Sequence, residues 1–271
     1  MGIDAHALNC LHYARRFGNL GETVTAGRQS LLLDAGTLEA RTGFRDPGPE
    51  RSLFAERLMM GAFGASSVES IDASSYEQAT HIHDMNLPMP AGFKTYDTVC
   101  DFGTIEHVFR ITQAIQNLIA LCKEGGQILH VAPANNFCGH GFWQMSPELF
   151  LSLYSRRNGF RDTEVFVATR KNDHQWFKVI PPRDGKRIHI NSKSKIYVIC
   201  RTVLERRPTG PLNVQQSDYI DLWADKGAPV EGTTPDMTES PEDTFGQRFA
   251  YKYFRGLSGS NPHLTAVRAG R

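Results

Sequence analysis

The sequence has no apolar run that reaches the length of about 18 residues that a transmembrane helix needs. Met1 to Arg16 lacks the apolar stretch of a secretory signal peptide. Gly2 is followed by His6 at the position where a myristoylation signal has Ser or Thr. These absences predict a cytoplasmic protein with no membrane partner.

Cysteines are few and scattered. The five of them are Cys10, Cys100, Cys122, Cys138 and Cys200, an odd number with no CxxC spacing. That pattern argues against a disulfide framework and against a zinc knuckle. We expect free thiols in a reducing compartment.

Charge of one sign is not in excess, because 30 Lys and Arg face 29 Asp and Glu and the formal net charge is +1. The chain as a whole therefore has no strong attraction for nucleic acid or for an anionic membrane. Basic residues gather locally at 186–187, 193–195 and 206–207. We interpret these groups as solvated surface, with an acidic substrate or RNA as the alternative.

The chain itself is that of a globular protein, with 271 residues of which 40% are apolar. Strand-like and helix-like segments alternate along it. The strand-like segments are 23–26, 67–71, 80–83, 98–100, 127–131, 165–169 and 196–200, and the helix-like ones are 5–17, 53–63, 111–122 and 146–156. This alternation predicts a Rossmann-like, doubly wound α/β fold with a mostly parallel seven-stranded sheet and helices on both faces.

Three parts are expected along the chain: an N-terminal helix in 1–21, the α/β domain in 22–205, and an extension in 206–271 packed on that domain. The extension is rich in Pro, Gly, Thr and acidic residues, and we predict two short helices in it, near 219–224 and 245–254. Residues 35–51 contain several Gly and Pro and no clean period, which favours a loop.

Polar clusters follow several of the predicted strands. In an open α/β sheet, ligands bind beyond the carboxyl ends of the strands. A carboxylate after the second strand can accept both hydrogen bonds of a ribose diol, although a turn or helix cap is the plainer role for such a residue. The clusters are 27–29, Asp72, Asp84, 101–107 and 133–140.

Three segments carry a family resemblance. The run YDTVCDFGTIEHV at 96–108 resembles the fourth-strand motif of class I S-adenosylmethionine-dependent methyltransferases. LCKEGGQIL at 121–129 is similar to their helix-to-fifth-strand signature, and VESIDAS at 68–74 is similar to their second strand and its acidic end. The segment 133–150, together with 27–29 and 76–86, resembles a little-characterised bacterial methyltransferase-like subfamily.

The resemblance implies S-adenosylmethionine as the cofactor. In this family Gly27 would lie under the methionine moiety, Asp72 would hold the ribose and Asp84 would face the adenine amine. The other residues that it implies for the cofactor site are Gln29, Met85, Asp101 and Gly103.

One departure bears on the cofactor. The family's first strand is normally followed by a GxGxG loop, whereas Thr25 to Gln29 contains the single glycine Gly27. The alternative is therefore a non-catalytic binding or scaffold protein that has kept the methyltransferase fold.

Two histidines are candidate general bases, because an imidazole can accept a proton from a hydroxyl or amine as the methyl group transfers. For His107 the alternative is a cap and packing pair with Glu106 at a helix start. His140 lies in a loop bracketed by glycines and rich in aromatics, which is typical of an active-site wall. We assign substrate binding to Asn135, Asn136, Phe142 and Trp143.

Two arrangements suggest a metal ion. His81 and His83 would share one face of a strand, and Asp101 could join Asn135 and Asn136 at the strand ends. The first pair has no distant third ligand, and the second match is positional only. We therefore assign no metal site from the sequence.

The prediction for function is an S-adenosylmethionine-dependent methyltransferase that acts on an oxygen or nitrogen of a small molecule. The methyl group would pass in line to the acceptor, with a His as the base. An RNA methyltransferase is a third possibility, which the net charge of +1 disfavours.

Overall fold

The computed structural model describes residues 2–47, 53–181, 187–190, 192–217, 219–220 and 264–269. None of the helices within these ranges has the length and apolar character needed to cross a membrane. Apart from residues 219 and 220, the two helices predicted for the C-terminal extension lie outside the described residues.

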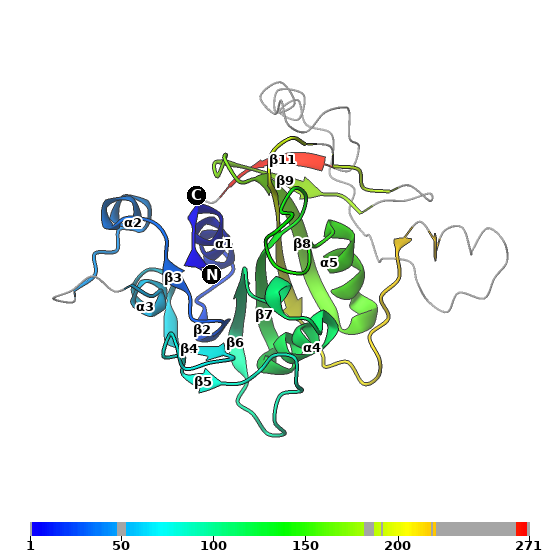
Figure 1. Ribbon diagram of the computed structural model, residues 1–271, viewed down its shortest axis with the longest axis horizontal. Coiled ribbons are helices and arrows are strands. Elements are labelled where there is room, and N and C mark those ends of the chain that lie inside the picture. The colour runs from blue at the N-terminus through cyan, green and yellow to red at the C-terminus, as the bar shows by residue number, and fades with distance from the viewer. Residues whose placement is uncertain are drawn as a thin grey trace.

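A nine-stranded sheet forms the centre of the molecule (Figure 1), in the order β11-β9-β8-β10-β7-β6-β2-β4-β5. Its strands are β2 (Gly21–Ala26), β4 (Ala65–Asp72), β5 (His81–Ile82), β6 (Tyr96–Phe102), β7 (Cys122–Pro133), β8 (Phe160–Thr169), β9 (Gln175–Val179), β10 (Ile196–Leu204) and β11 (Leu264–Arg268). Strands β2, β4, β5, β6 and β7 pair in parallel. A separate two-stranded sheet joins β1 (Gly2–Ile3) to β3 (Ser30–Leu31).

The predicted doubly wound α/β class is confirmed, but the prediction of seven mostly parallel strands is corrected. Strand β10 runs antiparallel to both of its neighbours, β7 and β8. Strand β9 adds to the edge as a hairpin with β8, and β11 pairs with β9 from far along the chain. The sheet is mixed because β10 lies antiparallel between β7 and β8, and β9 and β11 each pair antiparallel with their neighbours.

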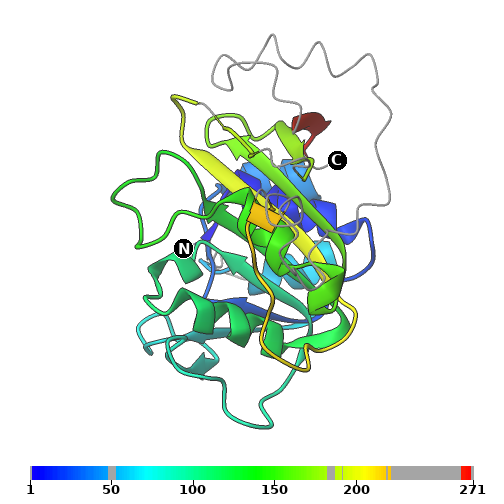
Figure 2. The ribbon, with the colours of Figure 1, turned by 90° about the vertical axis from the view of Figure 1, so that its right-hand side faces the viewer.

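Helices cover both faces of the sheet. Figure 1 shows α1, α2 and α3 on one side and α4 and α5 on the other, and Figure 2 brings the α4 and α5 side toward the viewer. Each side has its own apolar core. The helices are α1 (Ala5–Arg15), α2 (Ala35–Thr42), α3 (Glu56–Phe63), α4 (Ile111–Leu121) and α5 (Pro147–Leu153), with 3-10 turns η1 (Ile105–His107) and η2 (Arg156–Asn158).

Helix α2 lies where the sequence predicted a loop, so that prediction is wrong. The Asp34 carboxylate accepts a hydrogen bond from the Thr37 N–H at 2.9 Å and begins the helix, and Gly43 ends it in the left-handed conformation. Leu38 is its only buried side chain. A helix that buries one residue leaves no apolar period in the sequence, so only its two caps could have indicated it.

Helix α4 shows how the sequence pattern becomes packing. Its apolar stripe buries Ala114, Ile115 and Leu118 in the core that this helix shares with β6 and β7. The chain then turns directly into β7 at Cys122. This packing fixes where the segment between β6 and α4, which carries η1, can lie.

We expect Leu118→Ala to lower the free energy of unfolding by about 2–5 kcal/mol, because it removes a fully buried side chain and leaves a cavity. Denaturant unfolding followed by circular dichroism measures the change. Gln116→Ala on the exposed face of the same helix is the control and should be nearly neutral. Equal stability of the two variants would contradict the assigned packing of α4.

Candidate active site

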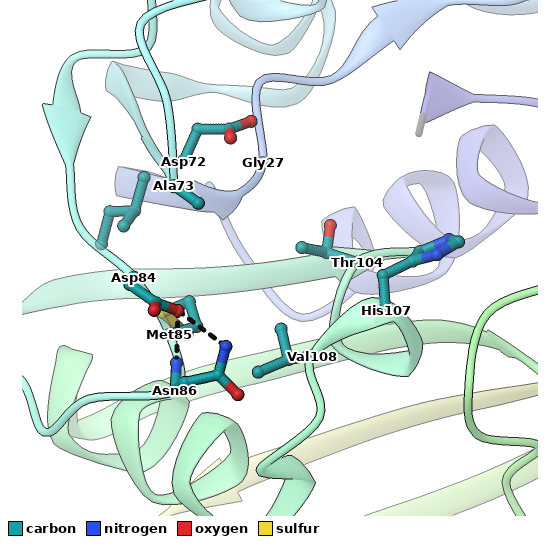
Figure 3. A pocket seen from close by; sticks show the side chains of 10 residues that line it. Gly27, Asp72, Ala73, Asp84, Met85, Asn86, Thr104, His107 and Val108 are labelled. Atoms are coloured by element: carbon teal, nitrogen blue, oxygen red, sulfur yellow. Dashed lines mark hydrogen bonds between the residues drawn. The ribbon is translucent and has the colours of Figure 1, made fainter.

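A pocket of about 400 Å³ lies at the carboxyl ends of the parallel strands. The pocket lies beside β2, β4 and β6, where the order of the parallel strands in the sheet reverses direction. Doubly wound sheets bind their ligands in the crevice at this point. Figure 3 shows Asp84 and His107 on opposite sides of the pocket, with Thr104 and Val108 between them. The lining residues are Gly27, Ile71, Asp72, Ala73, Asp84, Met85, Asn86, Thr104, His107 and Val108.

The turn after β2 forms the floor of the pocket. Gly27 has a φ of 68°, in the left-handed region that glycine adopts without strain. The side-chain amide of Gln29 donates to the carbonyl oxygen of Ala26 at 2.7 Å and is buried. Gln29 was predicted to contact the cofactor, but its side chain instead closes the turn from within, so that Gly27 alone faces the pocket.

Two carboxylates flank this floor. Asp72, at the end of β4, accepts a hydrogen bond from the Ser74 N–H at 3.3 Å and also lines the pocket. Asp84 accepts from the backbone and the side-chain amide of Asn86, at 2.9 and 2.8 Å. These two bonds lower the pKa of Asp84, so it stays ionised. Buried Met85 lies beside it.

Asp101 does not reach the pocket. Its carboxylate is completely buried, and one oxygen lies 2.9 Å from Nδ1 of His130. Nε2 of the same ring lies 2.7 Å from the Tyr154 hydroxyl. The neutral ring satisfies both contacts when Nδ1–H donates to Asp101 and Nε2 accepts from Tyr154. The structure therefore gives Asp101, predicted to contact the cofactor, a supporting role inside the sheet.

Asp101 also holds the turn η1 in place through hydrogen bonds to its backbone. The second oxygen of Asp101 accepts from the N–H groups of Thr104 and Ile105, at 3.2 and 3.1 Å. The Thr104 hydroxyl donates to the Ala26 carbonyl at 2.6 Å, which ties this turn to the β2 turn. Gly103 takes a φ of 79° where the chain leaves β6, and it does not line the pocket as a cofactor contact would.

Glu106, which follows in η1, is a completely buried carboxylate, and neither of its oxygens has a hydrogen-bond partner. Burial, together with the charge of Asp101, raises the pKa of its carboxyl to about 8. Burial lowers the pKa of the neighbouring His107, and His140 lowers it further. The sequence indicated Glu106 only as a cap or packing residue. Its burial without a partner became visible only in the structure.

The loop after β7 carries His140 to this place. The N–H groups of Phe142 and Trp143 both donate to the Glu106 carbonyl, at 2.8 and 3.2 Å. The rings of His107 and His140 meet edge to face with centroids 5.0 Å apart. Burial and the charge of Lys195 lower the pKa of His140. The two predicted histidines are thus neighbours, although only His107 lines the pocket.

Exposed aromatic side chains continue the surface beyond His107. Phe142 and Phe109 pack edge to face with centroids 6.3 Å apart, and both are largely exposed. The Trp143 ring N–H donates to the Val108 carbonyl at 2.9 Å. The predicted substrate residues Phe142 and Trp143 therefore lie beside the pocket-lining segment and outside the pocket itself.

Asn135 and Asn136, which were predicted to bind substrate, make hydrogen bonds to another segment of the chain. The Asn135 amide donates to the Ile190 carbonyl at 2.9 Å. The Asn136 amide donates to the carbonyls of Ser192 and Ser194, at 2.7 and 2.8 Å. Their amide groups hold the chain that leads into β10, and neither residue lines the pocket.

The two metal arrangements considered from the sequence do not form. His81 Nε2 contacts the Glu69 carboxylate at 2.6 Å, whereas His83 Nε2 contacts the Leu87 carbonyl at 3.1 Å. Asp101 is enclosed by His130, away from the asparagines that bind the chain near 190–194.

Sequence reasoning missed half of the pocket lining. Thr104 and Asn86 lie within or next to segments that were singled out, so their positions after β6 and β5 could have indicated them. Apolar lining residues carry no chemical signal in a sequence. They are Ile71, Ala73 and Val108.

No protein-family model matches the chain, and no curated protein matches it. Solved structures with a similar fold exist at low identity. The N-methyltransferase NodS from Bradyrhizobium japonicum WM9 is 12% identical over 73% of this chain and 94% of its own, with a TM-score of 0.41. A SAM-dependent methyltransferase from Thermotoga maritima is 16% identical over 73% of this chain and 88% of its own, with a TM-score of 0.39.

A sugar N-methyltransferase, KedS8 from Streptoalloteichus, is 11% identical over 82% of this chain and 77% of its own, with a TM-score of 0.32. All three are methyltransferases. Similarity at this level does not identify a reaction, because one fold hosts many chemistries. The function has to be inferred from the residues around the pocket.

Tyr154→Phe is expected to lower the free energy of unfolding by about 1–3 kcal/mol, because it leaves the buried Nε2 of His130 without a partner. Urea denaturation measures the loss. Tyr76→Phe, at a tyrosine that is 91% exposed, is the matched control and should leave stability unchanged. An unaltered unfolding free energy for Tyr154→Phe would contradict the Asp101–His130–Tyr154 chain.

Glu106 makes a pH-dependent contribution to stability. Its pKa of about 8 in the folded state lies above the ordinary value of 4.5, so folding favours the protonated acid. This contribution is complete below about pH 4.5 and is lost as the pH rises through about 8. Glu106→Gln removes the titration while keeping the shape of the side chain.

The melting temperature of Glu106→Gln, relative to wild type in metal-free buffer, should therefore rise between pH 5 and pH 9, a range chosen to bracket the shifted pKa of about 8. Differential scanning fluorimetry across this range provides the measurement, with exposed Glu205→Gln as the control. A pH-independent difference between Glu106→Gln and wild type would show that Glu106 is ionised in the folded protein throughout.

Proposed function

We propose that the protein binds S-adenosylmethionine in the pocket at the carboxyl ends of β2, β4, β5 and β6 and transfers its methyl group to a small-molecule acceptor. The observation that carries the proposal is the convergence of Gly27, Asp72 and Asp84 on one pocket. They come from three separate strand ends. Each was assigned to the cofactor from sequence motifs alone.

The chemistry of these three positions suits the cofactor. Asp72 offers carboxylate oxygens that accept hydrogen bonds from a ribose diol, and Asp84 can accept from the exocyclic amine of adenine. Gly27 has no side chain, which leaves backbone open to the methionine moiety. The pocket of about 400 Å³ is within the usual range for small-molecule and cofactor sites.

The acceptor is proposed to lie on the His107 side, opposite Asp84 (Figure 3). There the nucleophilic oxygen or nitrogen attacks the methyl carbon as the bond from carbon to the sulfonium sulfur breaks. Its proton passes to the imidazole group of His107 or its neighbour His140. Exposed Phe142 and Trp143 extend this side with apolar surface, which favours an acceptor with an apolar or aromatic part.

Asp72→Ala is expected to weaken the binding of S-adenosylhomocysteine by about tenfold to a hundredfold, because it removes charge-assisted hydrogen bonds to the ribose. Asp84→Asn should have a smaller effect, since its amide oxygen can still accept from an amine. Isothermal titration calorimetry gives the affinities, and thermal melting checks that each variant is folded.

Glu205→Ala is a matched control. Glu205 is an exposed carboxylate directly after a strand, but β10 runs antiparallel to β7, so Glu205 lies at the opposite edge of the sheet from Asp72. Its loss should leave the affinity unchanged. If Asp72→Ala binds as tightly as wild type, Asp72 is only a turn cap. The absence of both binding heat and a thermal shift for the wild type at millimolar ligand would favour the non-catalytic binding protein instead.

A further inference from the structure

A second polar cluster, which the sequence did not indicate, lies beside the pocket. It consists of Glu106 and His107 from η1 and of His140 from the loop after β7. Oε1 of Glu106 lies 3.9 Å from Nε2 of His107 and 3.5 Å from Nε2 of His140. One ligand atom from each of the three residues lies within 4.8 Å of the others, and across the described ranges no second such group of His, Cys, Asp or Glu occurs.

No hydrogen bond from the protein compensates for the burial of the carboxylate in this cluster. Glu106 is 0% exposed, and both of its oxygens lack a hydrogen-bond donor. An ionised carboxylate in such a place is strongly destabilised unless a cation lies against it. The side chains of His107 and His140 are 46% and 49% exposed, so the cluster is buried at the carboxylate and open at the imidazoles.

Both segments of the cluster are held by tight packing. The Asp101 carboxylate accepts hydrogen bonds from the backbone N–H groups at the start of η1. Gly141 has a φ of 70°, and a Cβ atom there would lie 2.8 Å from the Glu106 carbonyl oxygen. Only a glycine lets the loop approach η1 this closely, and this approach places the preceding residue, His140, over Glu106.

We propose that Glu106, His107 and His140 form a binding site for one divalent transition-metal ion, with Zn²⁺ as its representative. Two imidazole nitrogens and one carboxylate are a ligand set that zinc and similar ions accept, whereas Mg²⁺ and Ca²⁺ prefer oxygen ligands. Bonds of about 2.0–2.1 Å in a tetrahedral site place ligand atoms roughly 3.3 Å apart. The two carboxylate–imidazole distances of 3.5 and 3.9 Å are close to this value, and all three pairs lie within 4.8 Å, so rotation of the exposed rings would bring the ligand atoms to an ion.

Three protein ligands leave a fourth position for water or a bound molecule. His107 also lines the pocket, so that position is next to the proposed acceptor. Metal binding itself does not depend on methyl transfer. Only a role for the ion in turnover rests on the proposed function. In that role the two imidazoles bind the ion and no longer act as bases, and the ion instead lowers the pKa of an acceptor hydroxyl.

The test is Zn²⁺ binding by the full chain without an affinity tag. Calorimetry measures the affinity and stoichiometry, and a thermal-shift assay measures the change in melting temperature. We expect one ion per chain and a higher melting temperature with Zn²⁺, because an ion that binds only the folded state stabilises it. Glu106→Gln, His107→Ala and His140→Ala should each weaken binding by more than about tenfold and abolish the thermal shift. Mg²⁺ at the same concentration should produce neither effect.

Two control variants remove other side chains that could bind zinc, one close to the cluster and one distant from it. Cys138 is an exposed thiol in the His140 loop, and His174 is an exposed imidazole beside Asp173. Cys138→Ser and His174→Ala should bind Zn²⁺ as the wild type does. The proposal is overturned if the wild type does not bind, or if the cluster variants, folded by their melting curves, retain wild-type affinity. S-adenosylhomocysteine binding by Asp72→Ala is a separate measurement, so failure of the metal site is distinguishable from failure of the cofactor assignment.

Discussion

The buried Asp101 carboxylate is the interaction on which the site depends. One oxygen accepts from His130, which Tyr154 orients in turn, and the other accepts from two backbone N–H groups of the turn after β6. Buried polar groups are usually hydrogen-bonded, and both oxygens of Asp101 are, so these contacts hold the turn in the observed conformation. That conformation presents His107 and Thr104 to the pocket and buries Glu106.

The pocket has two walls of different character. Asp72 and Asp84 come from short turns after β4 and β5, where backbone N–H groups donate to both carboxylates. Across the pocket, Glu106 is buried without a hydrogen-bond donor under two half-exposed imidazoles. Asp72 and Asp84 both line the pocket, which suits hydrogen bonding to the proposed cofactor. A buried carboxylate without a hydrogen-bond donor suits a proton or a cation, so our proposals place cofactor binding and chemistry on opposite walls.

The success of the sequence analysis differed between residues for a physical reason. Gly27, Asp72 and Asp84 line one pocket, as the sequence suggested, because the end of a parallel strand can be located from its apolar pattern and such ends share one edge of a sheet. Their contact with a cofactor stays a prediction. Gln29 and Asp101 also follow strands, but both side chains turn inward. Gln29 donates to the Ala26 carbonyl in its own turn, and Asp101 contacts the His130 ring 29 residues away. The sequence also could not indicate the contact of Asn135, since its partner at 190 becomes a neighbour only in the folded chain.

The sequence by itself determined the α/β class, the extent of the apolar stripe in α4 and the strand ends that surround the pocket. These features follow from periods of about 2 and 3.6 residues and from local caps, which depend on near neighbours. Only the tertiary structure decided that β9 and β11 enlarge the sheet, that His140 lies over Glu106, and that Glu106 has no partner. Each of these depends on contacts between segments that are distant in the chain, and local residue patterns carry no information about which segments will meet.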